Sequence, residues 1–162
     1  MLFRSPDEPL ARRLRAQSFT LAQFLVTRAE GLHLPALDRR ALVQRHCHQA
    51  ALFGFDAEEQ ALATAGVTVS TLDAGCCGMA GSFGFEATHH ELSLRIGERA
   101  LLPAVRAQAP DTLIVADGFS CREQIAQGTG RQARHSAEVL RLALASPSPG
   151  VRRALVPGPG LG

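Results

Sequence analysis

The sequence predicts an α/β fold, a parallel sheet of about four strands flanked by helices, with its cysteine-bearing loops at the carboxyl edge. From Ala36 onward, short apolar runs alternate with segments of helical pattern. This alternation is typical of β-α units, whose strands pair in parallel. The chain has 162 residues, which is enough for one compact domain and too few for a large multi-domain enzyme.

Residues 1–36 are predicted to be a helical preface. Apolar residues recur there at helical spacing, Thr20 and Gln23 form a capping box, and Gly31 and Pro35 follow as helix-ending residues. A cysteine-rich domain is expected over 37–145. The remaining residues, 146–162, contain four Pro and four Gly, and we expect a disordered tail.

Four strands are predicted in the cysteine-rich domain. Val67 to Leu72 alternates apolar and polar residues, and Thr112 to Ala116 is an unbroken apolar run typical of a strand buried on both faces. Ala41 to Arg45 is a further candidate and is the first strand along the chain, so that Val67 to Leu72 is the second and Thr112 to Ala116 the third. Gln132 to His135 is a weaker fourth.

Cap residues predict where the helices between these strands begin. Gly66 marks the end of the helix that precedes the second strand. The expected starts are Asp56 with Glu59, Thr88 with Glu91, Ser120 with Glu123, and Ser136.

Each cysteine position follows a predicted strand and precedes a helix. Cys47 comes after the first strand, Cys76 and Cys77 after the second, and Cys121 after the third, on the first turn of the next helix. In a parallel sheet, the loops after the carboxyl ends of the strands lie along one edge, where ligands bind. The cysteines are therefore expected to converge in space.

Composition and charge exclude several classes of function. The net charge is +2 and 46% of the residues are hydrophobic, which is typical of an ordinary soluble protein and predicts neither a nucleic-acid partner nor a transmembrane segment. Charged residues interrupt the first 20 positions, so no signal peptide is expected and the predicted compartment is the cytoplasm. In that reducing compartment, cysteines are metal ligands, reactive thiols or packing residues more often than disulfides.

The local pattern favours an iron–sulfur cluster over zinc. Thiolates suit both, but adjacent cysteines chelate a single ion through a strained ring, whereas they can bind different irons of a cluster. Glycines surround the Cys76-Cys77 pair at a spacing of three, which lets the backbone approach a bulky group closely. The sequence contains no lysine and no phosphate-loop pattern, so a P-loop is excluded.

Other polar residues receive weaker assignments. His46, His48 and His135 follow strands and are candidates for a ligand, a hydrogen-bond donor to a cluster, or a solvated residue. For the rest we expect solvated or turn-stabilising roles: His33, His89 and His90 as solvated residues, and Asp73 and Asp117 as acceptors for loop N–H groups.

Four stretches of the sequence resemble a known family. They are His46-Cys47-His48-Gln49, Asp73 to Gly84 (DAGCCGMAGSFG), Ala116 to Arg122 (ADGFSCR), and His135 to Leu140 (HSAEVL). Residues 38–145 are similar to the cysteine-rich CCG domain, which is found in heterodisulfide reductase and in the iron–sulfur subunits of glycolate oxidase. The likeness is greatest to the C-terminal region of FAD-linked dehydrogenases of the D-2-hydroxyglutarate and D-lactate type.

The resemblance implies an electron-transfer role. It implies that Cys47, Cys76, Cys77 and Cys121 bind a cluster, while FAD and the oxidation of a small D-2-hydroxy acid belong to a flavoprotein dehydrogenase domain or subunit. The family's motif commonly ends in C-x-x-C, but here Gln124 stands at the last position, so a fifth thiol is missing. Four thiols suffice for one [4Fe-4S] centre, and no flavin site is expected in this chain.

Three other interpretations stay open at this point. The four thiols could hold a structural zinc ion in an interaction domain, or Cys76 and Cys77 could cycle through a vicinal disulfide in a thiol–disulfide reductase. The chain could also be a globular remnant that keeps the fold without a partner.

Overall fold

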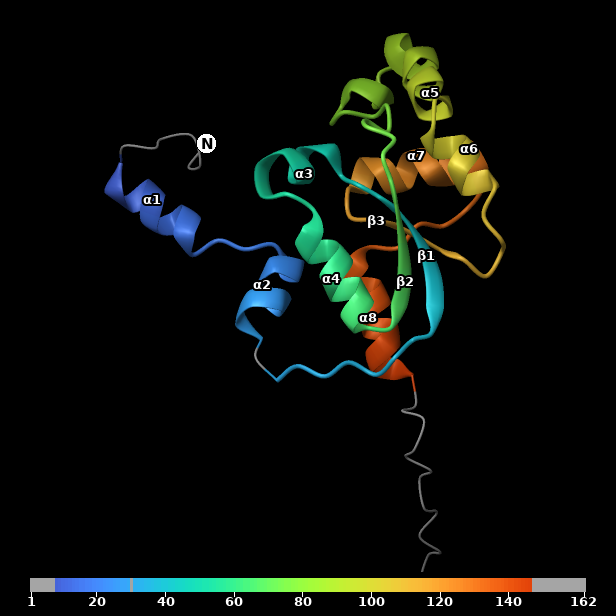
Figure 1. The fold of residues 1–162 in the computed structure, drawn as a ribbon. Coiled ribbons are helices and arrows are strands. Elements are labelled where there is room, and N and C mark those ends of the chain that lie inside the picture. Colours follow the sequence, from blue (N-terminus) through green and yellow to red (C-terminus); the bar gives the residue numbers. More distant parts are fainter. Residues whose placement is uncertain (1–7, 30, 147–162) are drawn as a thin grey trace, which may run out of the picture.

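The computed structural model describes residues 8–29 and 31–146. Its centre is a parallel sheet in the order β2-β1-β3, with β1 at Arg39–Gln44, β2 at Val67–Leu72 and β3 at Leu113–Ala116 (Figure 1). The strands predicted from the sequence match these bounds to within two residues. The α/β fold with a parallel sheet is confirmed.

The predicted fourth strand is reduced to a single bridge. Arg134 pairs in parallel with Val115, donating its N–H to Ile114 O at 2.8 Å and accepting from Ala116 N at 2.9 Å. The chain then turns into a helix capped by His135, which ends the pairing after one residue.

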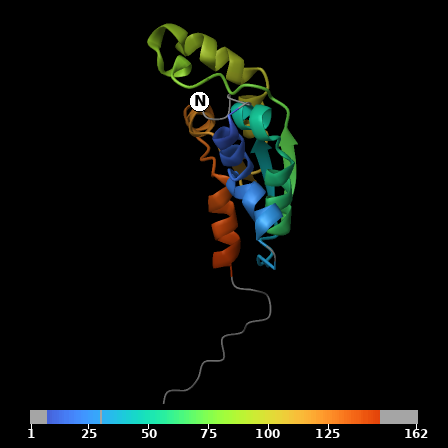
Figure 2. The ribbon, with the colours of Figure 1, turned by 90° about the vertical axis from the view of Figure 1, so that its left-hand side faces the viewer.

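The helices pack on both faces of the sheet (Figures 1 and 2). The α-helices are α1 Pro9–Ala16, α2 Leu21–Arg28, α3 Cys47–Phe53, α4 Asp56–Thr64, α5 His90–Glu98, α6 Leu101–Arg106, α7 Phe119–Thr129 and α8 Ser136–Ala145, and the short 3₁₀ turns are η2 Phe83–Phe85 and η3 Ala87–His89. Both views show η2, η3 and α5 beyond the carboxyl ends of the strands.

Two hydrophobic clusters lie on opposite faces of the sheet, because successive strand residues point to opposite sides. Val43 and Val115 face α4 and α8, together with Leu62 and Val139. On the other side, Leu42 and Ile114 belong to the second core cluster, which includes residues of α6 and α7. Its further members are Cys77, Met79, Leu101, Leu102, Val105, Ala116, Cys121 and Ile125. Two of the four cysteines are thus core residues.

Of the predicted helix starts, only the Thr20–Gln23 capping box is confirmed, at the start of α2. The prediction for Asp56 is wrong: the cap is Phe55, which is 5% exposed and fixed in the core, and Asp56 is the first residue of α4. The prediction for Thr88 is also wrong, because the 3₁₀ turn η3 runs directly into α5, whose cap is His89.

The other two starts lie one or two residues earlier than predicted. Helix α7 begins after Gly118, which places Cys121 on the first turn as expected, but Ser120 is not the cap. Helix α8 begins after His135, which forms a capping box with Glu138, because the Ser136 side chain is bonded to Asp117. At α8, a tertiary contact therefore decides the cap.

The predicted preface contains the two short helices α1 and α2, and α2 packs on α4. The predicted tail lies, apart from Ser146, outside the described residues. Among the described helices, none has the length and apolar character needed to cross a membrane. The division into preface, domain and tail stays a prediction.

Leu102 offers a test of this packing. Its side chain is fully buried, and its methyl groups fill the space beside Gly97 on α5 and Gly128 on α7. Leu102→Ala is expected to lower the free energy of unfolding by about 2–5 kcal/mol, because the truncated side chain leaves a cavity where α5, α6 and α7 meet. Urea unfolding measures this, with the exposed Leu144→Ala as control; equal effects of the two changes would contradict the packing described.

Candidate functional site

The three strands end at the same level of the sheet. The last residues are in register, with Gln44 opposite both Leu72 and Ala116. Cys47 is the first residue of α3, shortly after the end of β1, and Cys121 is on the first turn of α7. The loop after β2 carries the adjacent pair Cys76 and Cys77, and its Gly75 O accepts from Gln44 Nε2 at 3.1 Å.

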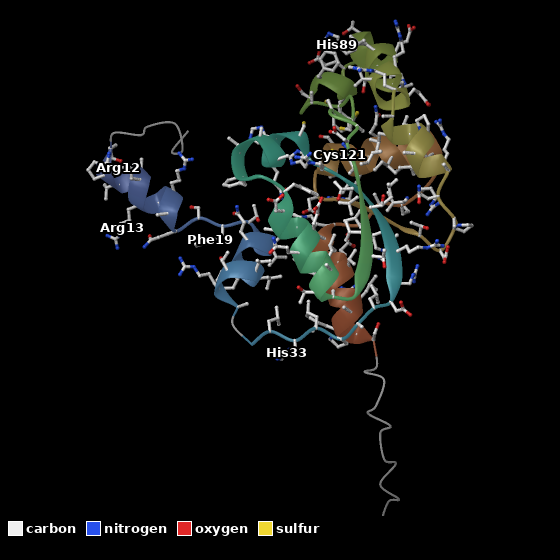
Figure 3. The ribbon with its side chains drawn as sticks, in the orientation of Figure 1. Arg12, Arg13, Phe19, His33, His89 and Cys121 are labelled. Carbon is white, nitrogen blue, oxygen red and sulfur yellow. The ribbon has the colours of Figure 1, made fainter. Side chains whose placement is uncertain are left out.

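All four cysteines border one cavity of about 510 Å³. The cavity is also lined by His46, His48, Ala80, Gly81 and Ser120. Figure 3 shows Cys121 at this edge, beside α3. The structure therefore brings together the cysteines that lie after three different strands.

Burial differs sharply along the cavity. Cys121 is 2% and Cys77 3% exposed, both packed in the second core cluster, whereas Cys76 is half-buried and Cys47 is exposed. The sulfur groups thus extend from the interior to the surface. All four are free thiols.

The two buried thiols differ in acidity. A hydrogen bond from the Cys121 thiol, helped by the backbone N–H groups of Met79 and Ala80, lowers the pKa of Cys77 to about 6 against the effect of burial. The same pairing and its burial raise the pKa of Cys121. Cys77 is therefore the thiol that ionises first in this pair.

Cys76 is less favourable to charge than Cys77. Burial raises the pKa of Cys76, with a contribution from its hydrogen bond with Cys47. The N–H of Gly78, which donates to Cys76 Sγ at 3.3 Å, acts in the opposite direction.

The loop that holds the cysteine pair depends on glycine at position 78. Its φ is +101°, and a Cβ there would lie 2.2 Å from Ser93 O. No side chain fits, so the loop packs directly against α5. Gly118 plays a similar part on the opposite side: a Cβ would lie 2.6 Å from the ring of His46 and 3.0 Å from Cys121 Sγ.

Two of the histidine candidates line the cavity and one does not belong to its lining. His46 and His48 border it, with ring centroids 6.3 Å apart. Burial, then the charge of His48, lowers the pKa of His46, while Asp117 opposes this. His135 instead caps α8, its Nδ1 accepting from Ala137 N at 3.1 Å.

The remaining polar candidates have structural roles or lie elsewhere. Asp117 accepts from Ser136 N at 2.7 Å and from Ser136 Oγ at 2.9 Å, so it does satisfy an N–H group, though that of α8. His89 stacks on Phe83 at 4.2 Å and is only partly exposed. Figure 3 shows His33 and His89 far from Cys121, at opposite ends of the molecule.

Within residues 8–29 and 31–146, no three His, Cys, Asp or Glu side chains are arranged to hold a single metal ion. The thiols instead surround a volume. Thiolates are soft donors, which suit zinc and iron–sulfur clusters.

Sequence reasoning missed a buried amide behind the cysteine loop. Gln124 is 1% exposed and donates through Nε2 to Cys77 O at 3.0 Å and to Ser93 O at 2.9 Å. The one available signal is its position three residues after Cys121, on the same side of a helix.

A second missed residue is Glu58, whose carboxylate is buried beneath α3. It is 3% exposed and accepts from Thr20 Oγ1 at 3.1 Å and from Gln49 Nε2. Its bonds join α2, α3 and α4, so it fixes the helix that begins with Cys47. Burial raises the pKa of Glu58, and the hydrogen bonds oppose the shift without cancelling it.

The chain has relatives among characterised enzymes. Over 97 residues, 59% of this chain, it is 38% identical to D-2-hydroxyglutarate dehydrogenase of Escherichia coli (strain K12), and over 82 residues it is 37% identical to the enzyme of the same name from Pseudomonas putida. Over 80 residues, 49% of this chain, it is 34% identical to one of the subunits of anaerobic glycerol-3-phosphate dehydrogenase from E. coli (strain K12). The chain is related to oxidoreductases.

The matches cover only a small part of these relatives. They span 9% and 8% of the two D-2-hydroxyglutarate dehydrogenases and 20% of the glycerol-3-phosphate dehydrogenase polypeptide. No protein-family model matches the chain, and no solved structure does.

The buried carboxyl predicts a pH-dependent stability. Because the folded state raises the pKa of Glu58 above its ordinary 4.5, it binds this proton more tightly than the unfolded state. The free energy of unfolding should therefore fall as pH rises from 4.5 through the folded pKa and level off above it. In Glu58→Gln this falling component is expected to be absent, as measured by urea unfolding across that range.

The exposed Glu91→Gln serves as control for the loss of one negative charge. Identical pH profiles for wild type and Glu58→Gln would show that burial does not penalise the Glu58 carboxylate.

Proposed function

We propose that this chain is an iron–sulfur electron-transfer domain in which Cys47, Cys76, Cys77 and Cys121 hold one [4Fe-4S] cluster. One observation carries the proposal: four free thiols, from three chain segments that each follow a strand, border a single cavity at the carboxyl edge of a parallel sheet. The residues of the domain proper are those predicted from the sequence, 37–145, with 1–36 as a preface.

The chemistry of the cavity suits such a group. Cys121 lies on the first turn of α7, at the positive end of the helix dipole, and the Gly78 N–H donates to Cys76 Sγ at 3.3 Å. The hydrogen bonding around Cys77 stabilises a thiolate, the form that binds metal. When bound, the cluster supplies a site that accepts and releases single electrons.

The chain's own residues then hold and shield the centre. Cys77 and Cys121 are backed by the second core cluster, which excludes water from the inner side. Exposed Cys47 and His48 lie on the outer side. Electrons would therefore enter or leave at the outer side, where a partner can approach closely.

The relatives support a place beside a dehydrogenase. We propose that the chain is part or partner of a FAD-linked oxidoreductase that oxidises a small D-2-hydroxy acid of the 2-hydroxyglutarate, lactate or glycolate type. The flavin and substrate sites belong to the remaining polypeptide or to a flavoprotein partner. Four free thiols suit the reducing cytoplasm as the place of action.

Purification under anaerobic conditions, followed by iron, sulfide and zinc analysis, tests the proposal. About four irons and four sulfides per chain are expected, with a broad visible absorption that bleaches on reduction. A colourless chain that cannot be reconstituted with iron and sulfide would overturn it. One zinc per chain, with unfolding on chelation, would indicate the structural zinc domain instead.

The low pKa of Cys77 favours one second candidate, a thiol–disulfide reductase that cycles Cys76 and Cys77. This function requires a metal-free chain that reduces a small disulfide. Alkylation of a single thiol should then abolish the activity. The 3% exposure of Cys77 weighs against direct attack on a substrate.

Single ligand changes give a sharper prediction. Cys76→Ser and Cys77→Ser are each expected to lose the [4Fe-4S] signal or convert it to a cluster with fewer irons, because one iron loses its thiolate. Iron content and the electron paramagnetic resonance of the reduced protein measure the effect. The control is Ser82→Ala, an exposed residue in the same loop that makes no cap bond; equal cluster content in all three variants would exclude the vicinal pair as ligands.

A further inference from the structure

A buried amide stands directly behind the cysteine loop. Gln124 on α7 is 1% exposed, and its Nε2 donates to Cys77 O at 3.0 Å, Ser93 O at 2.9 Å and Ser93 Oγ at 3.2 Å. The amide therefore joins three segments, namely α7, the loop after β2, and α5. A buried side chain with this many bonds has one orientation.

The bond to Cys77 O determines the direction of a neighbouring N–H group. The carbonyl of Cys77 and the N–H of Gly78 belong to one planar peptide unit, and the described residues contain no cis peptide bonds. In a trans peptide, the C=O and N–H point in opposite directions. Holding the carbonyl toward Gln124 therefore turns the Gly78 N–H away from α7, and there it meets Cys76 Sγ at 3.3 Å.

The surrounding backbone leaves this peptide unit little freedom. A Cβ on Gly78 would lie 2.9 Å from Gln124 Nε2, and a Cβ on Gly97 would lie 3.0 Å from the same atom and 3.2 Å from Cys77 O. Glycines on both sides thus allow the amide to reach the carbonyl. Loss of the Gln124 amide would remove the hydrogen bond to the buried Cys77 O. The Cys77–Gly78 peptide would then be less firmly held in its orientation.

We infer that Gln124 is a positioning residue: by holding the Cys77–Gly78 peptide, it directs the Gly78 N–H to Cys76 Sγ and so raises the reduction potential of the centre bound there. The effect on potential rests on the proposed function, whereas the positioning does not. Hydrogen bonds to ligand sulfurs stabilise the reduced, more negative state of a cluster. The sequence departs from C-x-x-C at this residue, and the structure gives Gln124 a role in holding the loop.

Gln124→Met is the main test, because methionine keeps the length of the side chain but donates no hydrogen bond. In the metal-free protein, the Gly78 amide is expected to exchange with solvent about five- to tenfold faster than in wild type, the effect of losing about 1 kcal/mol. Amide-resolved hydrogen exchange by NMR measures this. In the reconstituted protein, the midpoint potential is expected to shift to a more negative value.

Gln124→Glu provides a second, nearly isosteric variant, in which a carboxylate replaces the donor and faces two carbonyl oxygens. The same directions of change are expected at alkaline pH, where the carboxyl is ionised, and they should diminish as the pH falls and the protonated carboxyl can donate again. A loss of general packing would not be reversed in this way.

Gln108→Met is the matched control, because the Gln108 amide also donates to a backbone carbonyl, that of Ala104 on α6 at 3.1 Å, and does not contact the cysteine loop. It should change neither the Gly78 exchange nor the potential. Unaltered Gly78 exchange in both Gln124 variants would overturn the positioning role. A wild-type chain that takes up no cluster would overturn the proposed function and the effect on potential, while the exchange measurement in metal-free protein still decides the positioning.

Discussion

The in-register ending of three parallel strands is the constraint on which the site depends. Gln44 lies opposite both Leu72 and Ala116, so three chain segments leave the sheet at one level. Hydrogen bonding between the strands therefore brings the segments that carry Cys47, Cys76, Cys77 and Cys121 to one edge of the sheet, where the four residues border one cavity. The side chain of Gln44 also positions the loop after β2, since its amide donates to Gly75 O.

The site is built partly from the hydrophobic core. Cys77 and Cys121 pack with Met79 and Ile125, so the stability of the second core cluster and the geometry of the inner thiols are coupled. Glu58 acts on the outer thiol less directly. Glu58 joins α2 and α4 to α3, the helix that starts with Cys47. Changes far from the cavity are therefore expected to reach the thiols through helix packing.

Periodicity and one topological rule were enough to predict the sheet and the convergence of the cysteines. Apolar alternation located β2 to the residue, and an unbroken apolar run located β3, because burial on one or both faces leaves a direct mark on the sequence. Helix starts were predicted poorly because tertiary contacts decide them. Phe55 is fixed in the core, and Ser136 is bonded to Asp117, 19 residues away in sequence. Gln124 could not be assigned a role, since its partners Cys77 and Ser93 are 47 and 31 residues distant.

The two sides of the cavity have different chemical environments, and this asymmetry bears on the proposed electron transfer. On the inner side, the backbone N–H groups of Met79 and Ala80 stabilise negative charge on Cys77, joined in the metal-free chain by a hydrogen bond from the Cys121 thiol. On the outer side, Cys76 accepts from the Gly78 N–H, and Cys47 is open to solvent. A centre held by these four thiols has its inner ligands in a fixed, water-poor surrounding, so partner binding can change the dielectric around the outer ligands alone. Covering Cys47 would remove water from that side, which disfavours the more negative reduced state and so favours release of the electron to the docked partner.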